Sequence, residues 1–462
     1  MRFKRRLAAT VAGVVAAGGI ASVALSAASA QAATTTTTVA LPISQYSHMV
    51  VDPVHRHLFI SGGGSSSSIL VTDYSGQTVA TIPNEPGAYG LALSGNGSTV
   101  YAALSGSGAV SAISTSTLAE TARYSTGPNP AFVAYTSGKI WFSYFPPTPG
   151  GQAGIGSIDP STSPATVTLN ATNDPINTWG GAPMLAASPH GELVAGGPPG
   201  GSPIKLASYD VSSGRATVLA PSTYIDTASN LQSLQITPDG KDVVVASGAP
   251  YYHQVFQVSN LSAVGQYPTT FYPNSVSIAS DGTVAAGTDG LSAEVFLFAP
   301  GGSTPLSTYT FGTPDSTQLA NDGVAITPDA SELFAVSTDA SGANPALNIV
   351  TDPVQGPSTL SATGPATVNK DQPITLTGTL GGAAPYAGGQ TLHVTRVDPT
   401  HPNGVALPDV TTAADGSFTF TNTPPRAKVD TGTVTYTLSY AGDAHLTAAT
   451  ASVSVTVHYN NS

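Results

Sequence analysis

Aromatic side chains and carboxylates occur together in the polar stretches that separate the apolar segments of this chain. Flat rings stack on the C–H faces of pyranose sugars, and carboxylates accept hydroxyl hydrogen bonds, so this combination suits a glycan ligand. It also suits a cationic peptide, or the rings simply pack against neighbouring strands. The candidate binding residues are Tyr46, His48, Glu85, Tyr89, Asp174, Trp179, Asp226, Tyr252, His253, Tyr272 and Asp322.

Two histidines have a spacing at which both rings could bind one metal ion. His55 and His57 lie two positions apart, on the same face of a strand, and His48 is close in sequence. A metal site needs a third ligand at a defining spacing, and none is present. We therefore interpret these histidines as part of a solvated turn, and we expect no metal and no other cofactor.

Sequence motifs that define enzyme classes are absent. The chain has no G-x-S-x-G, no H-E-x-x-H, no phosphate-binding loop and no Asp-rich calcium loop. Ser202 and Lys205 match S-x-x-K, but they lie between a Gly/Pro stretch and a strand rather than at a helix start. If the protein is an enzyme, its catalytic residues would come from His48, Glu85, Tyr252 and His253.

The charge balance excludes two classes of partner. Four of the 14 Lys/Arg residues and no acidic residue lie in residues 1–32, which leaves 10 basic against 26 acidic residues. No basic cluster remains, so we expect no nucleic-acid binding and no attraction to anionic membranes. Because the chain has no cysteine, its stability must come from core burial rather than from disulfides.

The N-terminus has the pattern of a secretory signal peptide. Arg2, Lys4, Arg5 and Arg6 precede an apolar stretch, and Ala30-Gln31-Ala32 forms an A-x-A cleavage site. A membrane anchor is the alternative, but the glycines within the apolar stretch favour cleavage. We predict residues 1–32 as the signal peptide, a secreted product, and no membrane insertion after its removal.

A strand–turn–strand cassette recurs along residues 49–353. Clear copies are "LALSGNGSTVYAAL" (residues 91–104) and "LQITPDGKDVVVAS" (residues 234–247). The turn residues of successive copies are His55, Gly97, Gly138, Gly191, Gly240, Gly282 and Ala330. Their spacing of 41 to 53 residues is close to that of one four-stranded β-propeller blade.

Seven turns predict an all-β, seven-bladed β-propeller over residues 33–353. The last cassette is one strand short, whereas residues 34–43, "TTTTTVALPI", precede the first cassette without a blade of their own. We expect this segment to be the outer strand of the last blade, because closing the ring hides strand edges. The candidate binding residues would then gather on the loops at one end of the central channel.

The repeats resemble those of secreted, surface-layer-like propellers of the YVTN type. The similarity rests on "TVYAALSGSGAVSAISTSTLAE" (residues 99–120), with its second half repeated in "ILVTDYSGQTVATI" (residues 69–82). WD40 repeats are the weaker match, because Trp141 precedes Phe142 and Trp179 precedes Gly180, so there is no Trp-Asp pair.

The C-terminal part, residues 358–462, predicts a second all-β domain after a short linker at 354–357. In "TVTYTLSY" (residues 433–440) apolar residues alternate with Thr and Ser, as in a strand with one buried face. About seven such strands over some 100 residues predict an Ig-like β-sandwich. The segment "YAGDAHLTAATASVSVTV" (residues 440–457) resembles the closing signature of bacterial Ig-like repeats, which implies a spacer or adhesive module.

These observations favour a secreted, non-catalytic binding or adhesion protein. Its partner would be a cell-wall glycan or an extracellular protein. Two alternatives remain open: an extracellular propeller enzyme that acts on a polysaccharide or lactone, and a coat component that assembles with itself.

Overall fold

The computed structural model describes residues 36–146, 152–172, 174, 179–290, 293–382 and 385–459. These residues divide into two compact units, with the boundary in the chain between Gly356 and Pro357. The predicted signal peptide lies outside the described residues. In the described part of the chain, no helix is long and apolar enough to cross a bilayer, and the single helix is the 3₁₀ turn η1 (Gly63–Ser65).

Within the described residues, the N-terminal unit contains seven four-stranded antiparallel sheets. The central strands are β2 (His48–Asp52), β6 (Ala88–Leu93), β10 (Pro130–Thr136), β14 (Met184–Ala187), β18 (Ser229–Ile236), β22 (Pro273–Ile278) and β26 (Thr317–Ile326). The second strands are β3 (His57–Ser61), β7 (Thr99–Leu104), β11 (Lys139–Tyr144), β15 (Glu192–Gly197), β19 (Asp242–Ala249), β23 (Val284–Asp289) and β27 (Glu332–Asp339). The third strands are β4 (Ser68–Asp73), β8 (Ala109–Ser114), β12 (Gly154–Asp159), β16 (Ile204–Asp210), β20 (His253–Gln257), β24 (Ala293–Phe298) and β28 (Ala346–Thr351). The outer strands are β5 (Thr78–Pro83), β9 (Glu120–Ser125), β13 (Thr166–Thr168), β17 (Thr217–Ile225), β21 (Ala263–Tyr267), β25 (Ser307–Phe311) and β1 (Thr36–Ala40).

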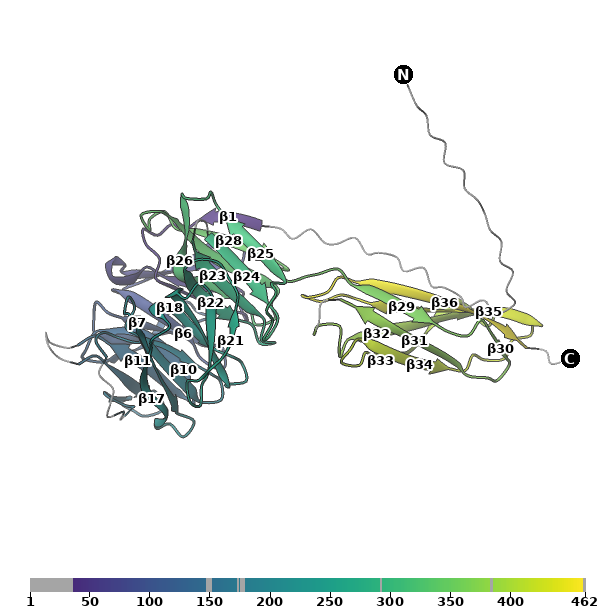
Figure 1. The fold of residues 1–462 in the computed structure, drawn as a ribbon, viewed down its shortest axis with the longest axis horizontal. Helices are drawn as coiled ribbons and strands as arrows, with labels where there is room; N and C mark the ends of the chain where they lie inside the picture. Colours follow the sequence, from purple (N-terminus) through teal and green to yellow (C-terminus); the bar gives the residue numbers. More distant parts are fainter. Residues whose placement is uncertain are drawn as a thin grey trace, which may run out of the picture. The chain divides into compact units, whose positions relative to one another are not determined.

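The central strands form a closed ring. Each contacts the central strand of the next sheet, and β26 contacts β2, so the last sheet lies against the first. Four-stranded antiparallel sheets around a common centre make a β-propeller, in which no single sheet has to bury both of its faces alone. Several of these central strands, including β6, β10, β18 and β22, are labelled in Figure 1.

The hairpin between the first and second strand of each sheet falls at a predicted turn. Gly97, Gly138, Gly191, Gly240 and Gly282 all have positive φ angles there, which glycine adopts without steric cost. The first and last sheets differ, because Arg56, next to the predicted His55, takes this conformation in the first sheet at φ 56°, and in the last sheet it is taken at φ 57° by Ala330. It is fully buried, so its methyl group is retained in the core despite the backbone strain.

Strand β1 is the outer strand of the last sheet. It pairs antiparallel with β28 from Thr36↔Val350 to Ala40↔Ala346, and Figure 1 shows the purple β1 beside the green β28. Only one edge of β1 is paired, and most of its side chains are exposed. Its attachment therefore depends on backbone hydrogen bonds and on Val39 and Leu41, which pack into the core between the last and first sheets.

The layers between neighbouring sheets hold the hydrophobic core. Between the first two sheets, for example, Phe59, Ile69, Leu91 and Val100 are all buried in one cluster. Since the chain has no cysteine, these layers carry the stability of the unit, at about 25 cal/mol per Å² of apolar surface buried.

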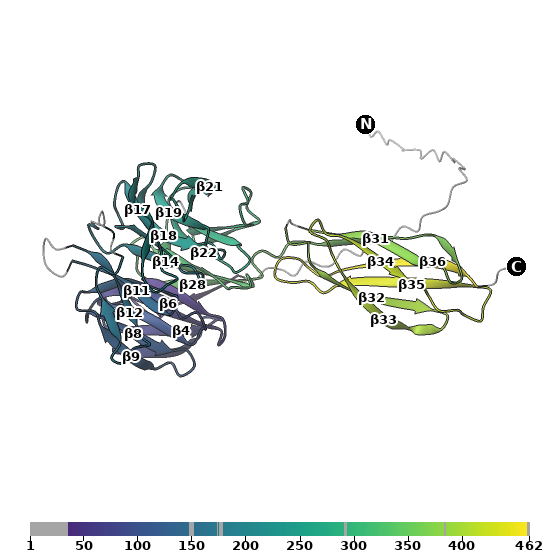
Figure 2. The ribbon, with the colours of Figure 1, turned by 90° about the horizontal axis from the view of Figure 1, so that it is seen from below.

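The C-terminal unit has two sheets. The smaller has the strand order β29 (Thr359–Thr363), β31 (Ile374–Gly381), β34 (Ser417–Asn422). The larger has the order β30 (Thr367–Asn369), β36 (Ala449–His458), β35 (Thr431–Tyr440), β32 (Thr391–Asp398), β33 (His401–Thr411). Figure 2 shows β32 and β33 side by side at one edge. In β35, Val434, Tyr436, Leu438 and Tyr440 are buried, and these are the residues of the predicted apolar face.

Candidate functional site

A central cavity lies between the seven innermost strands of the N-terminal unit. It has two adjacent sections of about 470 and 400 Å³, which share Phe132, Met184 and Asp322 in their walls. The larger section is lined by residues from β2, β6, β10, β14, β18, β22 and β26. The smaller, which we call the mouth, is lined by loop and strand-end residues, among them Tyr46 and Tyr89. Both volumes are within the range typical of ligand pockets.

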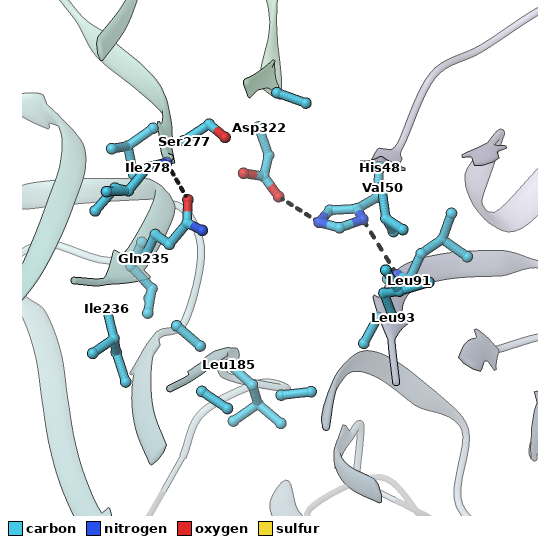
Figure 3. Close-up of a pocket in the computed structure, with 18 of the residues that line it drawn as sticks. His48, Val50, Leu91, Leu93, Leu185, Gln235, Ile236, Ser277, Ile278 and Asp322 are labelled. Carbon is cyan, nitrogen blue, oxygen red and sulfur yellow. Dashed lines mark hydrogen bonds and ion pairs between the residues drawn. The ribbon is translucent and has the colours of Figure 1, made fainter. Parts of the chain in front are cut away.

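On one side of the cavity His48 and Asp322 are in contact. The Nε2 atom of His48 is 3.1 Å from Oδ2 of Asp322, and the backbone N–H of Leu91 donates to Nδ1 of His48 at 3.3 Å; both contacts are drawn in Figure 3. Because Nδ1 accepts a hydrogen bond, it carries no proton, and the ring is neutral with its hydrogen on Nε2. Both ring nitrogens are therefore engaged.

Asp322 sits at an irregularity in β26, where the pairing with β27 shifts between Leu319 and Val324 and its own φ is +53°. Ser233 donates to its Oδ1 at 2.6 Å, and the Tyr46 hydroxyl donates to its carbonyl oxygen at 2.8 Å. Burial, followed by the negative charge of Asp322, raises the pKa of Tyr46 well above its usual value. The bulge thus turns a carboxylate into the cavity, where His48 and Ser233 hold its two oxygens and Tyr46 holds the backbone carbonyl.

A repeated hydrogen bond joins neighbouring central strands on this side of the cavity. Oε1 of Gln235 accepts from the backbone N–H of Ile278 at 2.9 Å (Figure 3). Ser277 accepts in the same way from Ile326, at 3.0 Å. In each pair a polar side chain of one sheet accepts a hydrogen bond from a backbone N–H of the next sheet. These polar residues therefore hold neighbouring central strands together as well as line the cavity.

The opposite side of the cavity is apolar. Phe132 of β10 and Met184 and Leu185 of β14 line it, and Figure 3 shows Leu185 across the lumen from Asp322. Leu91 and Leu93 of β6 extend this apolar wall as far as His48. At the mouth the ring of Tyr89 meets that of Phe132 edge-on, with centroids 5.8 Å apart. The cavity is therefore amphipathic: hydrogen-bonding groups face an aromatic and aliphatic wall.

The mouth contains a second carboxylate, Asp289, beside the amide side chains of Gln232, Gln318 and Asn321. Burial raises the pKa of Asp289 to about 6, partly offset by a hydrogen bond from the Leu319 backbone. Its Oδ1 is buried and has no hydrogen-bond partner among the described residues. A buried acceptor left without a partner is costly, so this oxygen is available to a donor on a ligand.

The structure thus brings together Tyr46, His48, Tyr89 and Asp322 of the predicted set, and it places the others elsewhere. Glu85 is fully buried between the first two sheets, where Ser111 donates to its Oε1 at 3.2 Å and Nη2 of Arg123 is 3.5 Å away. Burial, opposed by the Ser111 hydrogen bond, raises the pKa of Glu85 to about 7.

Trp179 and Asp174 belong to the packing of the fourth sheet. Trp179 is 2% exposed and lies in the core cluster that includes Tyr209. Asp174 is also buried; the Tyr209 hydroxyl donates to its Oδ2 at 3.3 Å. Lys205 lies over the Trp179 ring, with Nζ 5.4 Å from the ring centroid, so this tryptophan face is already covered.

His253 is a buried structural residue. Its Nε2 donates to the Ser275 carbonyl at 2.9 Å, and burial lowers its pKa to about 4 despite that bond. Tyr252 is half-buried and Asp226 is exposed, in the turn before β18. Tyr272 is exposed and packs edge-on against Tyr251. Its carbonyl accepts from the Asp289 N–H at 2.9 Å, so its backbone adjoins Asp289, but its ring does not line the mouth.

The paired histidines interact with each other and with a buried aspartate. The rings of His55 and His57 are stacked, with centroids 6.0 Å apart, and Nδ1 of His55 is 2.7 Å from Oδ2 of Asp52. His48 is on the cavity wall instead. No group of three or more potential metal ligands was found within the described residues.

Several cavity residues were not among the predicted ones. Gln235 and Ser277 line the cavity, and they alternate with apolar residues in the two central strands β18 and β22. Ser233 and Ser275 continue this alternation but are buried. A polar residue at every second position of an otherwise buried strand marks a face with a polar role, and this pattern could have identified Gln235 and Ser277. Phe132 and Asp289 have no such signal, because an aromatic residue or a strand-end aspartate occurs throughout the chain.

Comparison with known proteins gives a likeness of fold but no family. No protein-family model matches the chain, and no curated protein matches it. Among solved structures, Kuenenia stuttgartiensis hydrazine synthase superposes with a TM-score of 0.50 at 17% sequence identity, over 64% of this chain and 94% of that one. The Cps50 (Swd1) β-propeller domain of Myceliophteria thermophila has a TM-score of 0.49 at 13% identity, over 68% and 98% of the two chains. At these identities the likeness concerns the fold alone.

Proposed function

We propose that this chain is a secreted, non-catalytic binding protein whose central cavity recognises an extracellular glycan at its mouth. In this proposal the seven four-stranded sheets form a seven-bladed propeller of the YVTN type, and the C-terminal unit is an Ig-like sandwich that acts as spacer or adhesive module. The predicted signal peptide and the repeat pattern support the extracellular location.

The observation that carries the proposal is the amphipathic cavity. A pyranose presents a C–H face and a rim of hydroxyl groups. The wall of Phe132 and Tyr89 suits the first, and the carboxylate and amide groups of Asp322, Gln232 and Gln318 suit the second. A protein partner would instead require a broad exposed surface of at least ~1,000 Å².

The state of His48 supports binding rather than catalysis. A histidine acting as general base needs a free ring nitrogen within hydrogen-bond reach of its substrate. Here one nitrogen accepts from Leu91 and the other donates to Asp322. His253, the other candidate, is buried with Nε2 bonded to Ser275 and Nδ1 3.2 Å from the Thr269 hydroxyl.

The test is co-sedimentation of the chain comprising residues 33–462 with purified cell wall and with a panel of insoluble polysaccharides. Tyr89→Ala removes a ring from the mouth, and Tyr224→Ala is the matched control, because Tyr224 is 61% exposed on the outer strand β17. We expect the first variant to bind at least ~10-fold more weakly and the control to bind as the parent does. Absence of binding to every wall and glycan would refute the proposal.

A further inference from the structure

We propose that the cavity selects a glycan that carries a free primary ammonium group, an amino sugar without its acetyl group, and binds that ammonium at Asp322. This inference rests on the proposed function and names the chemical class of ligand for the same site. Three observations support it: the acidic side chains of the cavity wall, the hydrogen bonds that occupy both ring nitrogens of His48, and the apolar wall opposite Asp322.

The cavity carries negative charge with no fixed positive charge to cancel it. Asp322 and Asp289 line it, whereas no lysine or arginine occurs among the described residues of either section. A cavity lined by one sign of charge, with low-dielectric walls, concentrates ions of the opposite sign. The apolar strands β6, β10 and β14 provide such walls.

His48 does not neutralise Asp322. Protonation of its Nδ1 would break the hydrogen bond from the Leu91 N–H and place two donors against each other. The ring therefore donates to Asp322 as a neutral group. Ser233 is also a neutral donor, so neither side chain that is hydrogen-bonded to the carboxylate brings a positive charge to it.

Asp322 can still accept from a ligand. Its two oxygens provide about four acceptor positions, and the contacts from His48 and Ser233 occupy one on each oxygen. The Asp322 side chain is 21% exposed and contributes to the walls of both sections of the cavity. An ammonium group donates up to three hydrogen bonds, and charge-assisted bonds to a carboxylate are about twice as strong as neutral ones.

The aromatic wall adds to this preference. Phe132 lines both sections, and Tyr89 lines the mouth. Aromatic faces attract cations as well as C–H groups. A pyranose that carries an ammonium group therefore makes favourable contacts with both the carboxylate and the aromatic wall of the cavity. A uronic acid or a phosphorylated sugar would instead place a negative charge near Asp322 and Asp289.

The experiment compares three tetrasaccharides of equal length, built of glucose, N-acetylglucosamine or glucosamine, by calorimetric titration at a pH where the amine is protonated. We expect the glucosamine tetramer to bind at least ~10-fold more tightly than the other two, and this preference to shrink as salt is added. In Asp322→Asn the preference should fall to ~2-fold or less. In the control Asp226→Asn, which changes an exposed aspartate in a turn, it should persist.

The outcomes separate the two proposals. Equal affinity for the three tetramers, or a preference that Asp322→Asn leaves intact, would overturn the ammonium assignment while glycan binding stands. No binding of any tetramer, together with no co-sedimentation of any polysaccharide, would overturn both. If Asp322→Asn does not fold, the effect of salt on the parent chain is the test. A preference for the glucosamine tetramer that salt does not weaken would overturn the ammonium assignment, because a contact between neutral groups is not screened by salt.

Discussion

Glu85 and Asp322 are carboxylates in two different regions of the propeller, the layer between sheets and the central cavity. Glu85 is completely buried, its Oε2 has no hydrogen-bond partner among the described residues, and its pKa is raised to about 7 by burial. Asp322 is partly exposed to the cavity and accepts from His48 and Ser233. The layer between sheets thus gives a carboxylate too few hydrogen bonds to stabilise its charged form. The cavity wall, in contrast, provides donors to the carboxylate.

The difference shows how one architecture divides its tasks. Polar groups in the layers are constrained by packing, so changing them alters stability. Polar groups on the cavity wall have one side open, so changing them alters binding with little effect on stability. Variants in the two regions should therefore differ in which of these two properties they change.

Removal of β1 should expose the hydrophobic core between the last and first sheets, and it should lower the free energy of unfolding the most. A chain starting at Ser44 lacks the backbone pairing with β28 and the side chains of Val39 and Leu41. We expect a loss of at least ~5 kcal/mol in the free energy of unfolding, since burial of an aliphatic side chain contributes ~1.5–3 kcal/mol and the lost backbone pairing adds to this. Thermal denaturation against the chain starting at Ala33 measures it. Equal melting temperatures would show that β1 is dispensable.

Trp179→Ala should act on stability and not on ligand binding. Trp179 is buried in the layer with Tyr209, and truncation of a buried tryptophan costs ~3–5 kcal/mol. Denaturant unfolding, combined with glycan co-sedimentation of the folded fraction, separates the two effects. A variant of unchanged stability that no longer binds would contradict the assignment of Trp179 to the layer.

Glu85→Gln should make stability less dependent on pH. The pKa of Glu85 rises from 4.5 to about 7 in the folded protein, so between these values the folded state holds a proton that the unfolded state has released. Stability of the parent should therefore fall as pH increases from 4.5 to 7, by up to ~3 kcal/mol at ~1.4 kcal/mol per pKa unit. The glutamine mimics the protonated acid and should lack this slope.

The measurement is urea denaturation of both proteins at pH 5 and pH 8. We expect similar stabilities at pH 5 and a more stable variant at pH 8. The opposite ranking at pH 8 would mean that the contact with Arg123 outweighs the cost of burying the charge.

Ser233→Ala should have the smallest effect on stability, ~1 kcal/mol. It removes one donor to Asp322 and the acceptor for the Val276 N–H at 3.2 Å. The loss of a neutral hydrogen bond costs about 1 kcal/mol, and Asp322, which lines the cavity, can accept from water instead. The effect of the substitution on glycan affinity should be several-fold, because Asp322 loses a positioning contact. A stability loss above ~3 kcal/mol would show that this side of the cavity is packed like a layer.

The repeat architecture follows from the sequence, because its signal is periodic. Each turn from Gly97 to Ala330 lies in a hairpin of the structure, since backbone that needs positive φ selects glycine and strand pairs need alternation. The pairing of β1 with β28 joins segments about 310 residues apart. The only sequence signal for it is that the last repeat is one strand short, whereas an extra strand precedes the first repeat.

The site was predicted less completely. Loop position indicates which end of the ring a residue occupies, but not whether it points to the cavity or into a layer. Trp179 and Tyr89 both precede or begin a central strand, yet Trp179 is buried and Tyr89 lines the mouth. The contact of His48 with Asp322 depends on ring closure and on one bulge, and neither appears in any local pattern.

The hydrogen bonds between central strands have a consequence for how such a ring can evolve. Gln235 is tied to Ile278, and Ser277 to Ile326, so a side chain encoded in one repeat serves the main chain of the next. Duplication or exchange of a single repeat at these positions would leave an amide without an acceptor at the new junction. Recombination should therefore be tolerated more readily among β6, β10 and β14, where apolar residues meet, than across β18, β22 and β26.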